Sequence, residues 1–227
     1  MNFNWMRNYV SLLLKRRLRK VDILIPALEF LSRHGCANSS LVLGEFFRTG
    51  YLLDMDGFEC RKRCQLSGLV MKQVPDITKA EMYLKRACRQ GCLSAAYYLM
   101  PIYIDKQEYE KAYRCAQRSL PHLPRELRGC CYHALGYMFY NFNVGKNAKE
   151  IAIEYWRKSA YCGNGQAMYE LGVLYMFGEN VRRSLRISQR YFKKCILTNN
   201  FCVARAKCRL KEIEYEMNHK GQGRSGV

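Results

Sequence analysis

Histidine and proline are scarce in this sequence, and the motifs that mark common enzymes are missing. Its 227 residues include four histidines and five prolines, and no histidine pair has the HExxH spacing of a zinc protease. No GxSxG, phosphate-binding GxxxxGK[ST] or dinucleotide-binding GxGxxG motif is present. His133 falls next to the apolar face of an expected helix, which favours a packed histidine. We therefore expect no catalytic residue, no cofactor and no small-molecule substrate.

Long apolar runs are missing as well. No stretch of eighteen apolar residues occurs, so the sequence predicts no membrane-spanning helix. The short apolar run near the N-terminus precedes its basic residues, the reverse of the order in a secretory signal. We interpret residues 1–20 as a basic capping helix; attachment of this amphipathic segment to an anionic membrane surface is the alternative.

Acidic residues are few compared with basic ones. Nineteen Asp and Glu stand against 38 Lys and Arg, which gives a formal net charge of +19. Such a charge favours acidic partners, either a protein segment or nucleic acid. The candidate basic patch comprises Lys15, Arg16, Arg17, Arg19, Lys20, Arg61, Lys62 and Arg63.

Cysteines are plentiful, and two pairs stand one helical turn apart. Cys60 and Cys64 form one pair, and Cys88 and Cys92 form the other. Four thiolates can hold zinc, but structural zinc sites generally use a two-residue gap between paired cysteines. The spacing therefore does not favour zinc, and we expect no metal.

Small and aromatic residues recur along the chain in one frame. Gly172 stands thirty-six residues after Gly136, and Ser188 stands thirty-six residues after Ala152. Around each of them, apolar residues are three or four apart, which places them on one face of a helix. Small residues allow two such helices to approach closely. The pattern predicts a helical hairpin that repeats, because one hairpin cannot bury both of its faces alone.

These stretches resemble the Sel-one-like repeat, a relative of the tetratricopeptide repeat. The matching segments are LGEFFRTG (43–50), LGYMFYNF (135–142) and LGVLYMFG (171–178), with AIEYWRKSAYCG (152–163). The resemblance implies an all-α, right-handed solenoid of about four antiparallel helical hairpins with capping helices. Two departures stand out: Met100-Pro101 replaces the Leu-Gly step, and Phe142-Asn143 stands where a glycine would end a helix.

The repeat frame divides the chain. Residues 21–199 are expected to form the solenoid, with an insertion at 51–75; residues 200–218 form a C-terminal capping helix and 219–227 a flexible tail. The expected paired helices are 39–50 with 76–90, 94–104 with 107–120, 126–142 with 148–161, and 165–177 with 181–198.

The cysteines also bear on the cellular compartment. Some extracellular members of the family are disulfide scaffolds whose paired cysteines lie about eight residues apart. Eight residues after Cys88 stands Ala96, and eight after Cys195 stands Val203, so that framework is missing. The sequence predicts free thiols and a cytoplasmic location. A secreted, disulfide-rich repeat protein is the alternative.

In the stacked architecture, the first helix of each hairpin lines a concave groove. The frame leaves an outward row of aromatic, charged and methionine side chains, a composition typical of peptide recognition, although some of them could pack against the next unit. The sequence favours a non-enzymatic adaptor or scaffold that binds an acidic or amphipathic segment of a partner protein in a regulatory pathway. A basic regulator that contacts DNA or RNA is the alternative. The candidate groove residues are Arg48, Tyr98, Tyr137, Tyr140, Glu170 and Met176.

Overall fold

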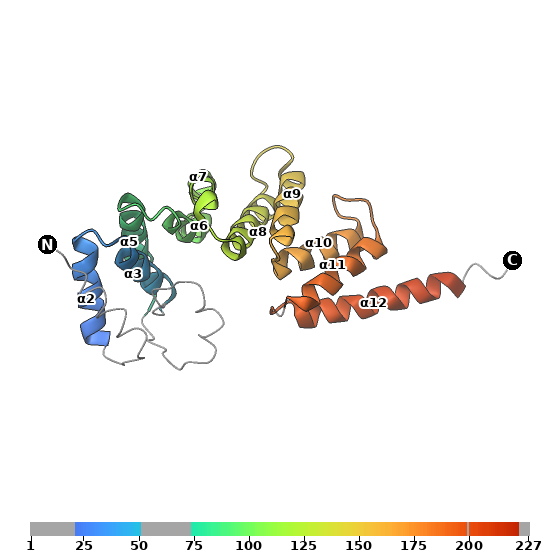
Figure 1. The fold of residues 1–227 in the computed structure, drawn as a ribbon. Coiled ribbons are helices and arrows are strands. Elements are labelled where there is room, and N and C mark those ends of the chain that lie inside the picture. The colour runs from blue at the N-terminus through green and yellow to red at the C-terminus, as the bar shows by residue number, and fades with distance from the viewer. Residues whose placement is uncertain (1–20, 51–73, 199, 223–227) are drawn as a thin grey trace. The chain divides into compact units, whose positions relative to one another are not determined.

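Helices make up all the regular structure that is described. A computed structural model describes residues 21–50, 74–198 and 200–222 (Figure 1), and no strand occurs in these ranges. This confirms the all-α prediction. No helix within these ranges has both the length and the apolar content that a membrane crossing needs. The expected capping helix 1–20 and most of the expected insertion 51–75 lie outside the described residues.

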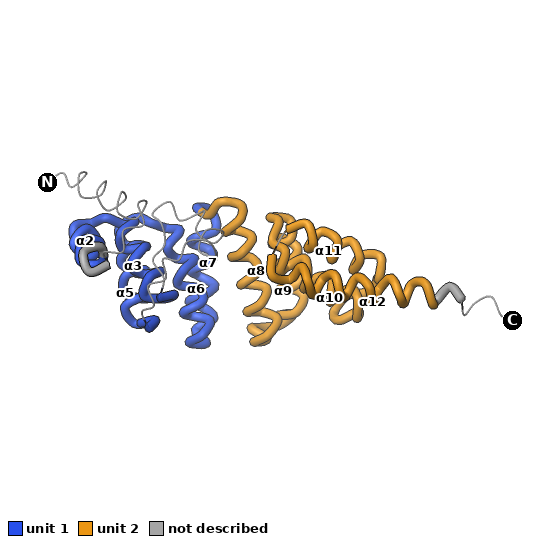
Figure 2. Tube along the Cα trace, turned by 90° about the horizontal axis from the view of Figure 1, so that it is seen from below, with its two compact units in different colours: residues 1–122 blue, residues 123–227 orange. Residues whose placement is uncertain are grey.

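The chain divides into two compact units, residues 1–122 and 123–227 (Figure 2). In unit 1, α3 packs on α5 and α6 on α7; in unit 2, α8 packs on α9 and α10 on α11. We call the first helix of each pair the A helix and the second the B helix. The helices are α2 (Val21–Arg33), α3 (Ala37–Thr49), α5 (Ile77–Arg89), α6 (Ala95–Asp105), α7 (Tyr109–Ser119), α8 (Arg125–Phe142), α9 (Ala148–Tyr161), α10 (Gly165–Phe177), α11 (Leu185–Leu197) and α12 (Val203–Gln222), with a 3-10 turn at Leu120–His122.

Local side chains and turn residues set where these helices begin and end. The Asp76 carboxylate accepts a hydrogen bond from the Lys79 backbone N–H at 2.9 Å and caps α5. Gly163 adopts φ +94° between α9 and α10, a conformation that strains other residues. Asn143 takes the left-handed conformation (φ 50°) after α8, where a glycine was expected, because asparagine tolerates this region.

The glycines of three A helices lie against a large side chain of the paired B helix. A Cβ atom on Gly172 would come within 2.6 Å of the Phe192 ring, which is fully buried. Helices that approach this closely need a residue without a side chain at the crossing. The three pairs are Gly44 with Leu84, Gly136 with Trp156, and Gly172 with Phe192. Equivalent glycines in equivalent surroundings confirm the repeat frame.

The α6–α7 hairpin reverses this arrangement of sizes. Met100 stands at the glycine position of α6, and Ala116 stands at the large-residue position of α7. Both side chains are fully buried. The volume that the B helix supplies in the other hairpins is thus supplied by the A helix here, which explains how the hairpin tolerates the departure at Met100.

Two helix boundaries differ from the sequence prediction by four residues, and the others lie closer to it. The B helix α11 begins at Leu185 rather than at residue 181, because the Ser184 hydroxyl accepts from the Ile187 N–H at 3.4 Å and caps it there. At the C-terminus, α12 continues to Gln222, so residues 219–222 of the expected tail are helical. Buried residues Cys202, Ala206 and Ile213 hold this end of the chain in a core shared with α10 and α11.

Candidate functional site

In unit 1 the structure brings together two of the expected groove residues, Arg48 and Tyr98. Tyr97 and Tyr98, which meet edge to face at 5.0 Å between ring centroids, lie near enough to act on the Arg48 charge. The Arg48 guanidinium donates to both carboxylate oxygens of Glu45, at 2.6 and 2.9 Å, and this bonding raises the pKa of Arg48. Since Glu45 is buried, Arg48 is an internally paired cation rather than an unmatched one.

In unit 2 the expected groove residues Tyr137 and Tyr140 occupy different environments on α8. Tyr137 is 47% exposed, and its ring meets exposed Phe142 edge to face at 6.1 Å. Tyr140 packs its ring on Trp156 at 5.0 Å and donates its hydroxyl proton to Glu179 at 3.0 Å. Sequence reasoning missed Phe142, although it follows Tyr137 on the same helix. The exposed aromatic surface of α8 is therefore the pair Tyr137 and Phe142.

The outward placement of Met176 was wrong. Met176 is 7% exposed and belongs to a core that includes Ala206 and Ile213 of α12. Arg183 strengthens this contact: its Nε donates to the Met176 carbonyl at 2.8 Å, and its Nη2 lies 2.8 Å from both carboxylate oxygens of Glu216. The frame missed this because it treated the last helix only as an end cap. In the structure, α12 covers part of α10.

Glu170, the other expected groove residue on α10, is half-buried on the side of α12. Burial raises the pKa of Glu170, and the charge of Arg205 on α12 acts in the opposite direction. The Arg205 guanidinium also lies over the Tyr169 ring at 5.2 Å. Residues of α10 are therefore occupied by contacts with the chain's own last helix. The residues of the expected basic patch all lie outside the described residues.

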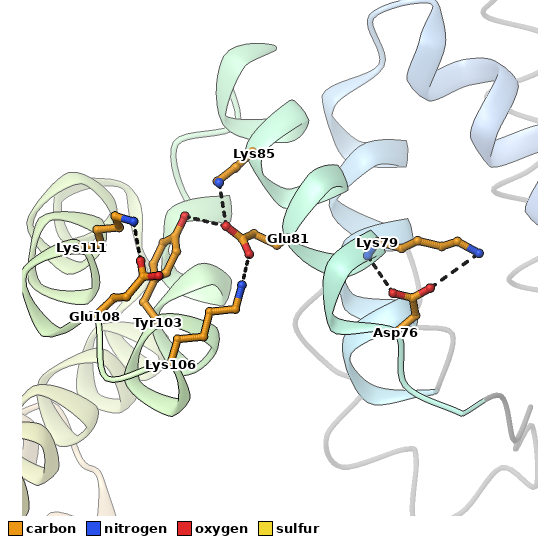
Figure 3. Close-up of polar contacts among 8 residues, drawn as sticks. All are labelled: Asp76, Lys79, Glu81, Lys85, Tyr103, Lys106, Glu108 and Lys111. Atoms are coloured by element: carbon orange, nitrogen blue, oxygen red, sulfur yellow. Dashed lines mark hydrogen bonds and ion pairs between the residues drawn. The ribbon is translucent and has the colours of Figure 1, made fainter.

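Charged residues link the α5 helix to the α6–α7 hairpin in unit 1 (Figure 3). The Glu81 carboxylate receives hydrogen bonds from Lys106 at 2.5 Å and from the Tyr103 hydroxyl at 3.3 Å, and it pairs with Lys85 at 2.6 Å. Burial opposes ionisation of Glu81, but the two lysines outweigh it and lower its pKa to about 2. This network connects consecutive hairpins within unit 1.

Replacing Glu81 with glutamine is expected to lower the free energy of unfolding by about 1–2 kcal/mol at neutral pH. Folded Glu81 stays ionised down to about pH 2, whereas its ordinary pKa is 4.5. Its contribution is therefore complete above pH 4.5 and is lost as the pH falls toward 2. Urea unfolding between pH 2 and 7 should show a weaker pH dependence for Glu81→Gln than for the parent protein. Glu110→Gln, in the exposed pair with Arg114, is the control and should change little; equal effects of the two variants would contradict the role of Glu81.

The described residues show no arrangement that marks a catalytic centre. No group of three or more potential metal ligands occurs among them. Burial raises the pKa of Cys115 and of Cys195 to about 11 and lowers that of His133 to about 4. At neutral pH these thiols stay protonated and this imidazole stays neutral, so Cys115 and Cys195 are poor nucleophiles.

Comparison with known proteins agrees with this geometry. A model of the Sel1 repeat, the Sel-one-like repeat, matches residues 63–92, 131–164 and 165–194. The last two stretches correspond to the α8–α9 and α10–α11 hairpins. The α6–α7 hairpin lies outside all three stretches. A search of curated proteins gave no match.

Two solved structures share the fold. A Sel1 repeat protein from Oxalobacter formigenes is 16% identical, with a TM-score of 0.65 over 85% of this chain and 70% of that one. A protective antigen of uropathogenic Escherichia coli with an SLR fold is 17% identical, with a TM-score of 0.53 over 85% of this chain and 44% of that one. Sel1 repeat proteins are generally non-enzymatic scaffolds that bind protein partners. The three matched stretches show that this chain contains Sel1 repeats, and the two solved structures share its fold.

Proposed function

We propose that this protein is a non-enzymatic adaptor that binds a segment of a partner protein along the A helix α8. The observation that carries the proposal is the exposed aromatic pair of Tyr137 and Phe142. Aromatic side chains supply much of the binding energy in protein interfaces and lose little conformational entropy when they are covered. A preformed helical surface also avoids the cost of ordering a loop on binding.

Charge around α8 favours an acidic partner segment. The Lys149 ammonium lies 5.6 Å from the centroid of the Tyr140 ring, and Lys146 and Lys149 are both exposed. The whole chain carries a formal net charge of +19. Carboxylates of a bound segment would pair with these lysines, while apolar side chains of that segment cover the rings of Tyr137 and Phe142.

Tyr137→Ala is expected to weaken partner binding about tenfold or more, because it removes one of the two exposed rings. Recovery of bound proteins after affinity capture, quantified by mass spectrometry against the parent protein, measures this. Tyr161→Ala is the matched control, since Tyr161 is 81% exposed on α9 and lies away from the α8 pair in sequence. Equal recovery with Tyr137→Ala and Tyr161→Ala would contradict the proposed surface.

The same capture tests nucleic-acid binding. A protein that makes six to ten phosphate contacts loses about 10³–10⁵ in affinity between 50 and 200 mM salt. Nuclease treatment that releases the captured proteins, together with such a salt response, would replace the adaptor by a regulator that contacts DNA or RNA. Retention of the partners after nuclease supports the adaptor.

A cytoplasmic location is part of this proposal. Its support is that cysteines in the described part of the chain are free thiols, among them the exposed Cys208 and the half-buried Cys130. Reducing compartments keep such thiols free. Counting thiols in protein isolated with an alkylating agent present tests it, and disulfide-bonded forms would indicate a secreted protein instead.

A further inference from the structure

Three hairpins share a stacked pair of aromatic rings beside the crossing of their helices. The A-helix ring comes three residues after the glycine position, and the B-helix ring comes three residues after a fully buried alanine or serine. The pairs are Phe47 with Tyr83 (5.6 Å, 6°), Phe139 with Tyr155 (5.7 Å, 17°), and Tyr175 with Tyr191 (5.9 Å, 11°). The stacked pair is therefore part of the hairpin's regular construction.

The α6–α7 hairpin has only half of this pair. Tyr103 stands at the A-helix position, but Cys115 stands at the B-helix position, three residues after buried Ala112. A thiol is much smaller than a phenol ring, so Cys115 leaves the Tyr103 ring, which is 5% exposed, without the B-helix ring that is stacked in the other hairpins. Near that ring lie the ammonium groups of Lys85 and Lys111, at 6.0 and 5.8 Å from its centroid.

A pocket of about 490 Å³ opens at this position. Its floor consists of buried or half-buried side chains of α5, α6 and α7, and its rim of exposed basic side chains of α5 and α7. The floor residues are Cys88, Ala96, Leu99, Tyr103 and Cys115, and the rim residues are Lys85, Arg89, Arg114 and Arg118. The volume falls within the range of about 300–1,000 Å³ that is usual for ligand sites.

The rim is strongly cationic, and no acidic residue lines the pocket. Lys85 pairs with Glu81, and Arg114 pairs with the exposed Glu110. Among the described residues no ion pair is recorded for Arg89 or Arg118. An arginine without a carboxylate partner, placed at the edge of an apolar floor, suits an anionic group of a ligand whose apolar part enters the pocket.

We propose that this pocket binds an aromatic side chain of a partner protein that is flanked by aspartate or glutamate residues. The incoming ring takes the place that a B-helix tyrosine fills in the other hairpins and packs on Tyr103. The flanking carboxylates pair with Arg89 and Arg118. Because the site lies in unit 1, it is a second binding site, separate from the α8 surface in unit 2.

The compactness of the rim argues for a peptide rather than a nucleic acid. Proteins that bind single strands without sequence preference combine a basic track with several aromatic platforms for successive bases. Here the pocket is lined by one aromatic residue, Tyr103, together with four basic residues. A segment with one aromatic residue among carboxylates matches both features.

Filling the pocket from within tests the proposal. Cys115→Tyr restores the side chain that the other hairpins carry, so it is expected to close the pocket without changing the charge. The probe is a synthetic peptide with one tryptophan flanked by glutamates, titrated by calorimetry against the full-length protein. We expect the parent protein to bind the peptide. Cys115→Tyr should weaken binding at least about tenfold, because the tryptophan ring of the peptide can then no longer be buried against Tyr103. Cys208→Tyr, at an exposed cysteine of α12, is the matched control and should bind as the parent does.

Further probes and variants keep the result decisive. A peptide with alanine in place of tryptophan, and one with lysines in place of the glutamates, should each bind at least about tenfold more weakly. The double variant Arg89→Gln, Arg118→Gln changes only exposed residues and tests the rim if Cys115→Tyr does not fold. Three results would overturn the proposal. The first is that the parent protein does not bind the peptide, and the second is that both variants bind it as the parent does. The third is that a single-stranded oligonucleotide binds more tightly than the peptide and that Cys115→Tyr abolishes this binding. Tyr137→Ala should leave the peptide bound, so failure here is distinguishable from failure of the α8 surface.

Discussion

Replacing Gly136 with methionine is expected to lower the free energy of unfolding by about 3 kcal/mol, and Trp156→Ala by about 3–5 kcal/mol. A Cβ atom at Gly136 would overlap the Trp156 indole ring, which is buried. The first change overfills the crossing of α8 and α9, and the second empties it. Urea unfolding followed by circular dichroism measures both.

The double variant Gly136→Met, Trp156→Ala should be more stable than the sum of the two losses predicts. It recreates in α8–α9 the arrangement that α6–α7 already has, with Met100 on the A helix and Ala116 on the B helix. Residues in contact commonly show coupling free energies of about 0.5–3 kcal/mol, and we expect recovery near the upper end. If the decreases in the free energy of unfolding of the two single variants simply add, the small Ala116 side chain does not compensate for the large Met100 side chain.

Ile213→Asp is expected to release α12 from α10 and α11. Ile213 is fully buried in the core that contains Met176 and Phe192. An unpaired carboxylate there costs about 3 kcal/mol or more, and detaching the helix relieves that cost. Cys202, which is buried in the same core, should then react with maleimide about a hundredfold faster, the factor that corresponds to about 3 kcal/mol. Mass spectrometry of timed labelling measures the rate.

Tyr215→Asp is the control for this experiment. It introduces the same charge two residues away on the same helix, at an exposed side chain. Labelling of Cys202 should stay near the parent rate in this variant. A similar rate in Ile213→Asp and Tyr215→Asp would show that the apolar core does not hold α12 in place.

Much of the fold could be predicted because the repeat frame depends on local spacing. The positions of Gly44, Gly136 and Gly172 identified the helix crossings, and helical periodicity placed the paired helices within a few residues. The start of α11 was missed because Val181 stands four residues before Leu185, at helical spacing, whereas the capping bond of Ser184 decides where the helix begins. A single side-chain hydrogen bond outweighs periodicity at such a boundary.

The candidate site could be predicted less well, because it depends on contacts between elements. The spacing that placed Met176 outward is correct for α10 alone, but it contains no information about the helix that packs against it. The sequence did carry a signal for the pocket in unit 1: Cys115 occupies the frame position of Tyr83, Tyr155 and Tyr191. That signal becomes meaningful only when the stacked rings of the other hairpins are known.

The reversed sizes at Met100 and Ala116 limit how this chain can change by recombination. A crossover between repeats that exchanged only one helix would bring Met100 against a large residue such as Trp156, or leave Ala116 opposite a glycine. Either product would carry a clash or a void at the crossing. Viable exchange therefore requires breakpoints outside the hairpin, so that both helices are inherited together.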